Sequence, residues 1–242
     1  MVIRAITFDF WNTLYADEGH AFRALTRRRL DHLARALAGV GANPSNSELY
    51  EAYKDGFAMY LAAWREQRHL GAHEHVSYIF DRLGAHPDDG TVDRVARCVE
   101  EVGLGFHLTL QRGAAESIPQ LAGAGIKLGI ISDTGLTPGR VLLQFLERDG
   151  LLEHFSTATF SDQTGVAKPH PRMFIETLTA LDVPPSQAAH VGDMPRTDIA
   201  GALSLGIMAI RFAGYDDRRE PPPADAVIRD HRSLLRILEL PA

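Results

Sequence analysis

The chain has 242 residues, of which 45% are hydrophobic and 23% charged, with a net charge of −6 and a single cysteine, Cys98. These values are typical of a globular protein with one large domain or a core and a smaller companion, and they exclude an intramolecular disulfide. The sequence shows no basic run, no apolar stretch of membrane-spanning length and no charged-then-apolar leader, so it predicts a cytoplasmic protein that binds neither nucleic acid nor a membrane.

The first predicted element is a buried strand over residues 2–8, because VIRAITF is short, largely apolar and rich in β-branched residues. From about 18 to 106 the apolar residues recur at helical spacing only. Within this block we expect the arginines at 27–29 on a solvated helix face. His73 and His75 lie in the polar stretch GAHEHVS, and we expect both to be exposed in a loop.

Strands and helices alternate through the second half of the chain. The predicted strands are 126–132, 156–161, 188–193 and 207–212, with helices between them and a short strand and a helix at the end. This alternation favours an α/β fold in which a doubly wound parallel sheet carries helices on both faces. The helical block interrupts it, so we predict a core domain formed by 1–16 and 107–242 and an inserted all-helical domain over 17–106.

Polar side chains follow four of the predicted strands. Asp9 ends the first strand, Ser132 the second and Asp193 the fourth, while Lys168 follows the third after a short loop. Because ligands of open α/β sheets bind at the carboxyl ends of the strands, we expect these residues to converge. The carboxylates suit a hard cation such as Mg²⁺, and the lysine and hydroxyl suit a phosphate or another anion.

Four segments in this order resemble the sequence motifs of the haloacid dehalogenase (HAD) superfamily. The segments read FDFWNTL at 8–14, IISDTG at 130–135, GVAKPHPRMF at 165–174 and HVGDMPRTDIAGA at 190–202. The helical block between the first two segments resembles the cap of subfamily I. The resemblance implies a Rossmann-like core with a helical cap, and a hydrolase that acts on a small phosphorylated molecule.

The resemblance also implies roles for particular residues. Asp9 is the expected nucleophile, which forms an aspartyl-phosphate that water later hydrolyses. Mg²⁺ is expected between Asp9, the backbone carbonyl of Trp11 and Asp193, and Asp198 either binds the metal or orients its surroundings. Lys168 is expected to act on the transferring phosphoryl group in the same site.

Four side chains are expected to bind the phosphate group itself. Ser132 and Lys168 are expected to hold the phosphoryl oxygens, assisted by Thr13 and Asp133 in the neighbouring turns. Ser132 and Lys168 therefore count, with Asp9, as the expected catalytic residues.

Trp11 departs from the pattern that the resemblance implies. The phosphatases of the superfamily carry a second aspartate two residues after the nucleophile, which serves as a general acid and base. Indole exchanges no proton at neutral pH, so a phosphatase of this kind needs another acid, a water, or a leaving group that needs little help. The candidate substitutes are Asp133, Asp17, Glu18 or a histidine of the cap.

Two other functions stay open at this point. A 2-haloacid dehalogenase-like hydrolase also has an aromatic residue in place of the second aspartate and forms a carbon ester on Asp9. The Gly192–Asp193 pair and Asp198 favour the metal-dependent side, because carboxylates clustered without a metal repel one another and an anionic haloacid. The third possibility is a protein that binds a phosphorylated ligand with little turnover.

Substrate choice is expected to depend on the cap. The candidate contacts there are Tyr53, Tyr60, Trp64, Arg65, Arg68 and Tyr78. We expect the cap to open and close on hinges near 15–20 and 105–112, since closure excludes water.

Overall fold

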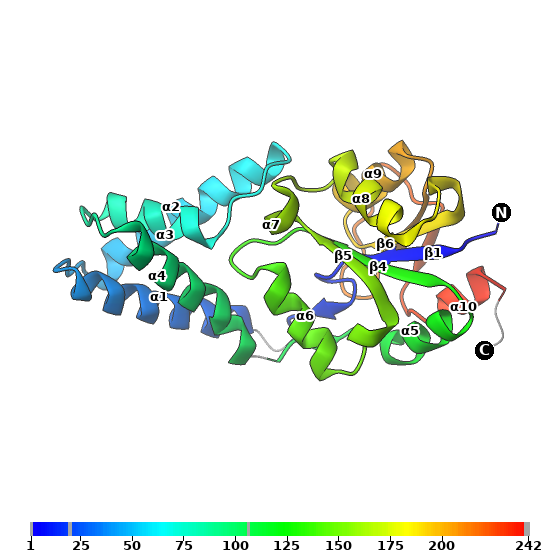
Figure 1. Cartoon of the computed structure of the whole chain (residues 1–242), viewed down its shortest axis with the longest axis horizontal. Coiled ribbons are helices and arrows are strands. Elements are labelled where there is room, and N and C mark those ends of the chain that lie inside the picture. The colour runs from blue at the N-terminus through cyan, green and yellow to red at the C-terminus, as the bar shows by residue number, and fades with distance from the viewer. Residues whose placement is uncertain (1, 19–20, 106, 240–242) are drawn as a thin grey trace.

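The computed structural model describes residues 2–18, 21–105 and 107–239. Its main sheet has six parallel strands in the order β5-β4-β1-β6-β7-β8 (Figure 1). The strands are β1 (Ala5–Phe8), β4 (Lys127–Ser132), β5 (Phe155–Phe160), β6 (Ala188–Gly192), β7 (Met208–Phe212) and β8 (Ala226–Ile228). The predicted α/β fold with a helical insert is confirmed.

Strand β1 lies at the centre of the sheet and is buried along its whole length. Phe8 pairs with Ile130 of β4 on one side and with Val191 of β6 on the other. Because the strands are parallel, the residues that follow β1, β4 and β6 emerge at the same edge. This register places the first, second and fourth motifs next to one another.

Helices cover both faces of the sheet (Figure 1). The helices beside the sheet are α5 (Ala114–Gly123), α6 (Gly139–Arg148), α7 (Ser161–Thr164), α8 (Pro171–Leu181), α9 (Ala200–Ser204) and α10 (Ser233–Ile237). Helices α5, α6 and α10 bury their apolar sides with one face of the sheet, and α8 and α9 cover the other. In the described ranges, no helix combines the length and the apolar character needed to cross a bilayer.

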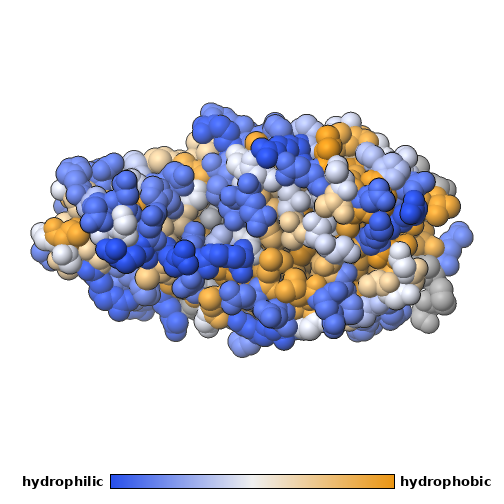
Figure 2. Space-filling model, in the orientation of Figure 1, coloured by the Kyte–Doolittle hydropathy of each residue, from blue (hydrophilic) through white to orange (hydrophobic). Residues whose placement is uncertain are grey.

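The insert consists of α1 (Ala21–Gly39), α2 (Asn46–Arg65), α3 (Ala72–Arg82) and α4 (Asp89–Glu101). These helices share an apolar core of their own, which includes Leu33, Ile79 and Phe80. Ser45 begins α2 through a capping box, because its side chain accepts from the Glu48 N–H and its own N–H donates to the Glu48 carboxylate. The face of the insert seen in Figure 2 is mostly hydrophilic, as amphipathic helices around a core require.

The two chain segments that join the insert to the sheet pair with each other. Strand β2 (Tyr15–Ala16) and strand β3 (Thr109–Leu110) form an antiparallel ladder. The expected hinges include positions 19, 20 and 106, which lie outside the described residues. The domain boundaries at 16/17 and 106/107 stay a prediction.

Two expectations for the insert are wrong. Arg29 is buried rather than solvated, because its guanidinium donates to the carbonyls of Val99 and Leu136 at 3.0 and 2.8 Å. His75 lies inside α3 rather than in a loop, and its Nε2–H donates to the carbonyl of Tyr53 at 3.0 Å. Burial lowers the pKa of His75 to about 4, so the ring is neutral in the folded protein.

The contact of α2 with α3 leads to a prediction about Gly56. A Cβ at this position would lie 2.3 Å from the His75 ring, which is buried and bonded to the Tyr53 carbonyl. We expect Gly56→Ala to lower the free energy of unfolding by about 1–3 kcal/mol in urea titration, the usual cost of overpacking. The matched control is Gly39→Ala, where nothing lies within 4 Å, and which should leave stability unchanged or raise it. Equal effects of the two variants would show that α2 and α3 are not tightly packed here.

Candidate active site

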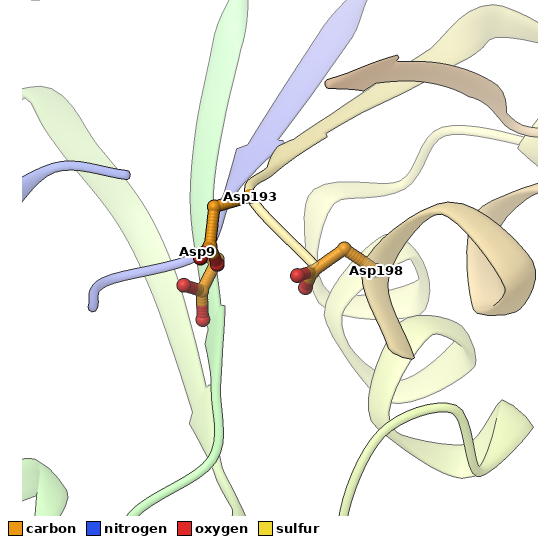
Figure 3. Close-up of side chains that lie close together, drawn as sticks. All are labelled: Asp9, Asp193 and Asp198. Atoms are coloured by element: carbon orange, nitrogen blue, oxygen red, sulfur yellow. The ribbon is translucent and has the colours of Figure 1, made fainter. Parts of the chain in front are cut away.

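Three carboxylates meet at the carboxyl edge of the central strands. Asp9 directly follows β1, Asp193 directly follows β6, and Asp198 lies in the π-helical turn Pro195–Ile199. One oxygen atom of each lies within 4.8 Å of the others, and all three residues are buried. Figure 3 shows the carboxylate of Asp198 turned toward those of Asp9 and Asp193. The structure thus joins residues that are far apart in the sequence.

The local backbone makes room for Asp198. A Cβ on Gly192 would lie 2.3 Å from the Asp198 side chain, so only glycine allows this approach. In the turn, the N–H groups of Thr197 and Asp198 both donate to the carbonyl of Met194. The Met194 N–H donates in return to Asp198 Oδ2 at 3.0 Å. Asp198 is therefore held in one orientation toward the cluster.

Lys168 supplies the positive charge that contacts this cluster. Its Nζ donates to Asp9 Oδ1 at 2.5 Å, to Asp198 Oδ1 at 2.6 Å and to the carbonyl of Ile131 at 3.0 Å. These contacts use all three donors of the ammonium, and the side chain is only 3% exposed. One cation is thus shared between two of the three carboxylates.

The electrostatics of the cluster follow from this imbalance. Burial raises the pKa of Asp9 to about 8, although Lys168 opposes the rise. Burial and the charge of Asp198 raise the pKa of Asp193 to about 7. Burial also acts to raise the pKa of Asp198, but Lys168 and His190 hold it well below its usual range. Asp9 and Asp193 therefore retain protons near neutral pH unless a further cation neutralises them.

The arrangement fits a divalent cation. Asp193 Oδ2 is buried and has no hydrogen-bond partner among the described residues. An orphaned carboxylate oxygen costs free energy unless a proton or a metal ion binds it. Three carboxylates at this spacing form the oxygen-rich donor set that Mg²⁺ prefers.

His190 belongs to the site and was missed in the sequence. It is fully buried in β6, and its Nε2–H donates to Asp198 Oδ1 at 3.2 Å while its Nδ1 accepts from the Thr7 hydroxyl at 2.9 Å. Burial lowers the pKa of His190, so the neutral ring acts as a fixed donor. The available signal was a histidine within the apolar strand AAHVG, which is costly unless it has a partner.

The other expected phosphate-binding residues differ in placement. Ser132 is buried, and its hydroxyl donates to Asp9 Oδ1 at 3.1 Å. Asp133 borders the cavity that contains the three carboxylates and Lys168, here called the acidic cavity. Thr13 is fully buried, is not among the residues that line this cavity, and its Oγ1 has no partner in the described part of the chain. The carbonyl of Thr13 accepts from His231 Nε2 at 2.8 Å, which fixes the turn after Asp9.

A family model described as haloacid dehalogenase-like hydrolase matches residues 3–206, which is most of the chain. The chain belongs to this family of hydrolases. The expected membership is thereby confirmed, and α1–α4 form its helical cap.

Three known proteins illustrate the likeness. The glyceraldehyde 3-phosphate phosphatase of Methanopyrus kandleri is 28% identical over 98% of this chain and 97% of its own length. A 2-haloacid dehalogenase from Pseudomonas syringae pv. Tomato DC3000 superposes with a TM-score of 0.73 at 26% identity, covering 98% of this chain and 99% of that chain. The magnesium-bound HAD-hydrolase YfnB from Bacillus subtilis shares the fold, with a TM-score of 0.62 at 20% identity over 99% and 100% of the two chains.

In this HAD hydrolase, Trp11 lies at the edge of the acidic cavity. Its ring packs against Phe10 and Phe22, with centroids 5.2 and 5.6 Å apart. The ring also borders a second, apolar cavity under the cap, so it stands between the two spaces.

The carboxylates that the sequence offers as alternative acids already have partners. Asp133 accepts from Trp64 Nε1 at 2.8 Å and from the backbone N–H of Lys168 at 2.9 Å, one bond to each oxygen. Asp17 accepts from the N–H of Phe22 at 2.8 Å, and Glu18 accepts from a side-chain N–H of Gln111 at 3.4 Å. Burial raises the pKa of Asp133, although the charge of Lys168 and the bonds from Trp64 and Lys168 oppose the rise.

The cap reaches the site through α2. Trp64 bonds to Asp133 of the core, and the Arg196 guanidinium lies 5.3 Å from the Trp64 ring centroid. Tyr60 and Trp64 border the acidic cavity.

The other expected cap contacts lie elsewhere. Tyr78 packs on the apolar core of the cap. Arg68 pairs with Glu66 at the surface. Arg65 borders a separate depression beside Lys168.

The shared ammonium leads to a stability prediction. Lys168→Met leaves Asp9 and Asp198 as neighbouring buried acids without their cation, so we expect the free energy of unfolding at neutral pH to fall by about 3–5 kcal/mol. Urea titration in the presence of a chelator measures the change. The control is Lys54→Met, which removes a half-exposed lysine paired with Glu51 and should change stability by less than about 1 kcal/mol. A loss no greater than that of the control would show that the buried cluster does not depend on Lys168.

Proposed function

We propose that this HAD hydrolase is a Mg²⁺-dependent phosphatase of a small phosphorylated metabolite, with Asp9 as the nucleophile. The observation that carries the proposal is the buried cluster of three carboxylates that share one lysine at the carboxyl edge of the sheet. The Methanopyrus relative, which is named a phosphatase and matches nearly the whole chain, supports the same reaction class.

Asp9, Asp193 and the backbone carbonyl of Trp11 would hold the Mg²⁺, with Asp198 as a further ligand or as a group that orients Lys168. The orphaned Oδ2 of Asp193 and the raised pKa values of Asp9 and Asp193 support this ligand set. A bound Mg²⁺ supplies positive charge that neutralises the carboxylates and the phosphoryl oxygens.

The chemistry of the chain's own residues follows from their contacts. A carboxylate oxygen of Asp9 attacks the phosphorus while the bond to the ester oxygen breaks, and water then cleaves the resulting acyl phosphate to regenerate the carboxylate. Lys168 and Ser132 both donate to Asp9 Oδ1, so their donors border the position that the phosphoryl group takes. They would hold the phosphoryl oxygens, with Asp133 positioning the backbone of Lys168.

Trp11 affects which leaving groups this site can expel at a useful rate. The ring offers no exchangeable proton at the position where a general acid would stand, and the neighbouring carboxylates are held as hydrogen-bond acceptors. We expect the departing oxygen to take its proton from water. Esters whose leaving group is a weak base should react fastest.

A 2-haloacid dehalogenase is the second candidate, because a structural neighbour with that name superposes well and because halide departure needs no proton. In this reaction Asp9 would attack carbon and form an ester. The buried carboxylate cluster argues against it, since a negatively charged haloacid would be repelled by Asp193 and Asp198.

The first functional prediction concerns Asp9. Protein with Mg²⁺ should release phosphate from p-nitrophenyl phosphate or acetyl phosphate, and chelation of the metal should stop the reaction. We expect Asp9→Asn to lower kcat by at least about 10³-fold, because the amide is not a nucleophile. The matched control is Asp182→Asn, which makes the same change at the surface end of α8 and should retain full activity.

The alternatives give different results in the same assay. Chloride release from 2-chloropropionate without metal would contradict the phosphatase and support the dehalogenase. Absence of turnover on all three compounds would support a protein that only binds a phosphorylated ligand.

A second functional prediction concerns Trp11. Trp11→Asp places a carboxyl group where a general acid would act, so kcat on glycerol 3-phosphate, a poor leaving group, should rise by up to about 10²-fold. The control Trp11→Asn has nearly the same shape but no proton to give, and it should not show this gain. A gain of equal size in both variants would mean that the bulk of the indole, and not the missing acid, limits turnover.

A further inference from the structure

A large apolar cavity lies under the cap, beside the acidic site. Its volume is about 390 Å³, within the range of about 300–1,000 Å³ typical of ligand pockets. Most of its wall is aromatic or aliphatic and comes from the motif that contains Asp9, from α1 and from α2. The main contributors are Trp11, Phe22, Leu25, Tyr53, Phe57 and Tyr60.

This apolar cavity and the acidic cavity adjoin. The acidic cavity, of about 150 Å³, contains the three carboxylates and Lys168. Trp11, Tyr60 and Asp133 line both spaces. A molecule with one end at Asp9 therefore has its other end directed past Trp11 into the apolar cavity.

Two aromatic residues of the cavity wall are partly exposed to solvent. Phe22 is 46% exposed and Phe57 is 44% exposed. Phe22 packs on Trp11, and Phe57 packs on Tyr60, each with ring centroids 5.6 Å apart. The cavity is thus walled by two aromatic pairs whose outer rings are open to solvent, and exposed apolar surface grouped at a pocket marks a binding site.

The charged groups at the cavity are engaged by the protein. Arg29 donates to two backbone carbonyls and to Thr137 Oγ1, and Asp133 accepts from Trp64 and from the backbone of Lys168. Their hydrogen bonds are directed to the walls. The remaining surface therefore favours an apolar occupant over one with several hydroxyl groups.

We propose that this cavity receives the organic part of the substrate and that the substrate is an aryl phosphate monoester. This inference rests on the phosphatase proposed above, with the phosphoryl group at Asp9. The aromatic walls match an aryl ring, and an aryl oxide leaves as a weak base, which suits a site where Trp11 occupies the position of the acid. The triose phosphate in the name of the Methanopyrus relative is smaller and more polar than this cavity accommodates best.

The test compares 1-naphthyl phosphate with glycerol 3-phosphate. Calorimetric titration of the inactive Asp9→Asn protein with Mg²⁺ should give a Kd for the naphthyl ester roughly 10- to 100-fold lower, the effect of burying one aromatic group. In the active protein, Phe57→Ala should raise KM for 1-naphthyl phosphate by about tenfold or more. The matched control is Ile175→Ala on α8, since Ile175 is 49% exposed and lies outside both cavities.

The outcomes separate this inference from the proposed function. Equal or tighter binding of glycerol 3-phosphate would overturn the inference, as would an unchanged KM in Phe57→Ala. If either ester is hydrolysed, the phosphatase stands whatever the preference. If neither these esters nor p-nitrophenyl phosphate and acetyl phosphate are hydrolysed, the phosphatase fails, while the calorimetric comparison still decides whether the cavity selects an aryl group.

Discussion

The buried ion pairs of Lys168 hold the candidate site together. Lys168 lies in the loop between α7 and α8. Its ammonium donates to Asp9, which follows β1, to Asp198 in the turn after β6, and to the carbonyl of Ile131 in β4. A buried ammonium with three acceptors keeps its charge, and each acceptor keeps its position because moving it would leave a buried charge unpaired. One side chain thus fixes the relative positions of groups from three strands or the turns that follow them. The sheet register brings the motifs near each other, and Lys168 orients them.

The positive charge of Lys168 pairs with only two of the three carboxylates. Lys168 satisfies Asp9 and Asp198, while Asp193 keeps a buried oxygen without a partner in the described residues. His190, itself held by the Thr7 hydroxyl, donates to Asp198, and together with Lys168 it keeps that carboxylate charged. The carboxyl groups without sufficient positive charge are therefore Asp9 and Asp193, whose pKa values are raised to about 8 and about 7. In the proposed phosphatase, a cation placed there would offset this imbalance of charge.

The sequence predicted the fold and the convergence of Asp9, Lys168 and Asp193 because both depend on chain order. Alternating strands and helices produce a parallel sheet, and polar residues after its strands meet at one edge. The burial of Arg29 and His75 was not predictable in the same way. Each is satisfied by backbone carbonyls supplied by other helices or loops, and no local pattern records such a distant acceptor. The bond from Trp64 to Asp133 likewise exists only because α2 reaches over the sheet edge.

Trp11 connects the chemistry of the site with the shape of its pocket. In the proposed phosphatase, the indole supplies no proton to the leaving group. This disfavours departure of an alkoxide, the conjugate base of an alcohol whose pKa lies close to the value of about 15.7 for water. A phenol, with a pKa near 10 like that of tyrosine, leaves without this help. The same indole packs on Phe22 and forms the wall that the acidic and apolar cavities share. Under the proposed function, the lack of a proton donor and the apolar space beside the indole favour the same class of ester, an aryl phosphate.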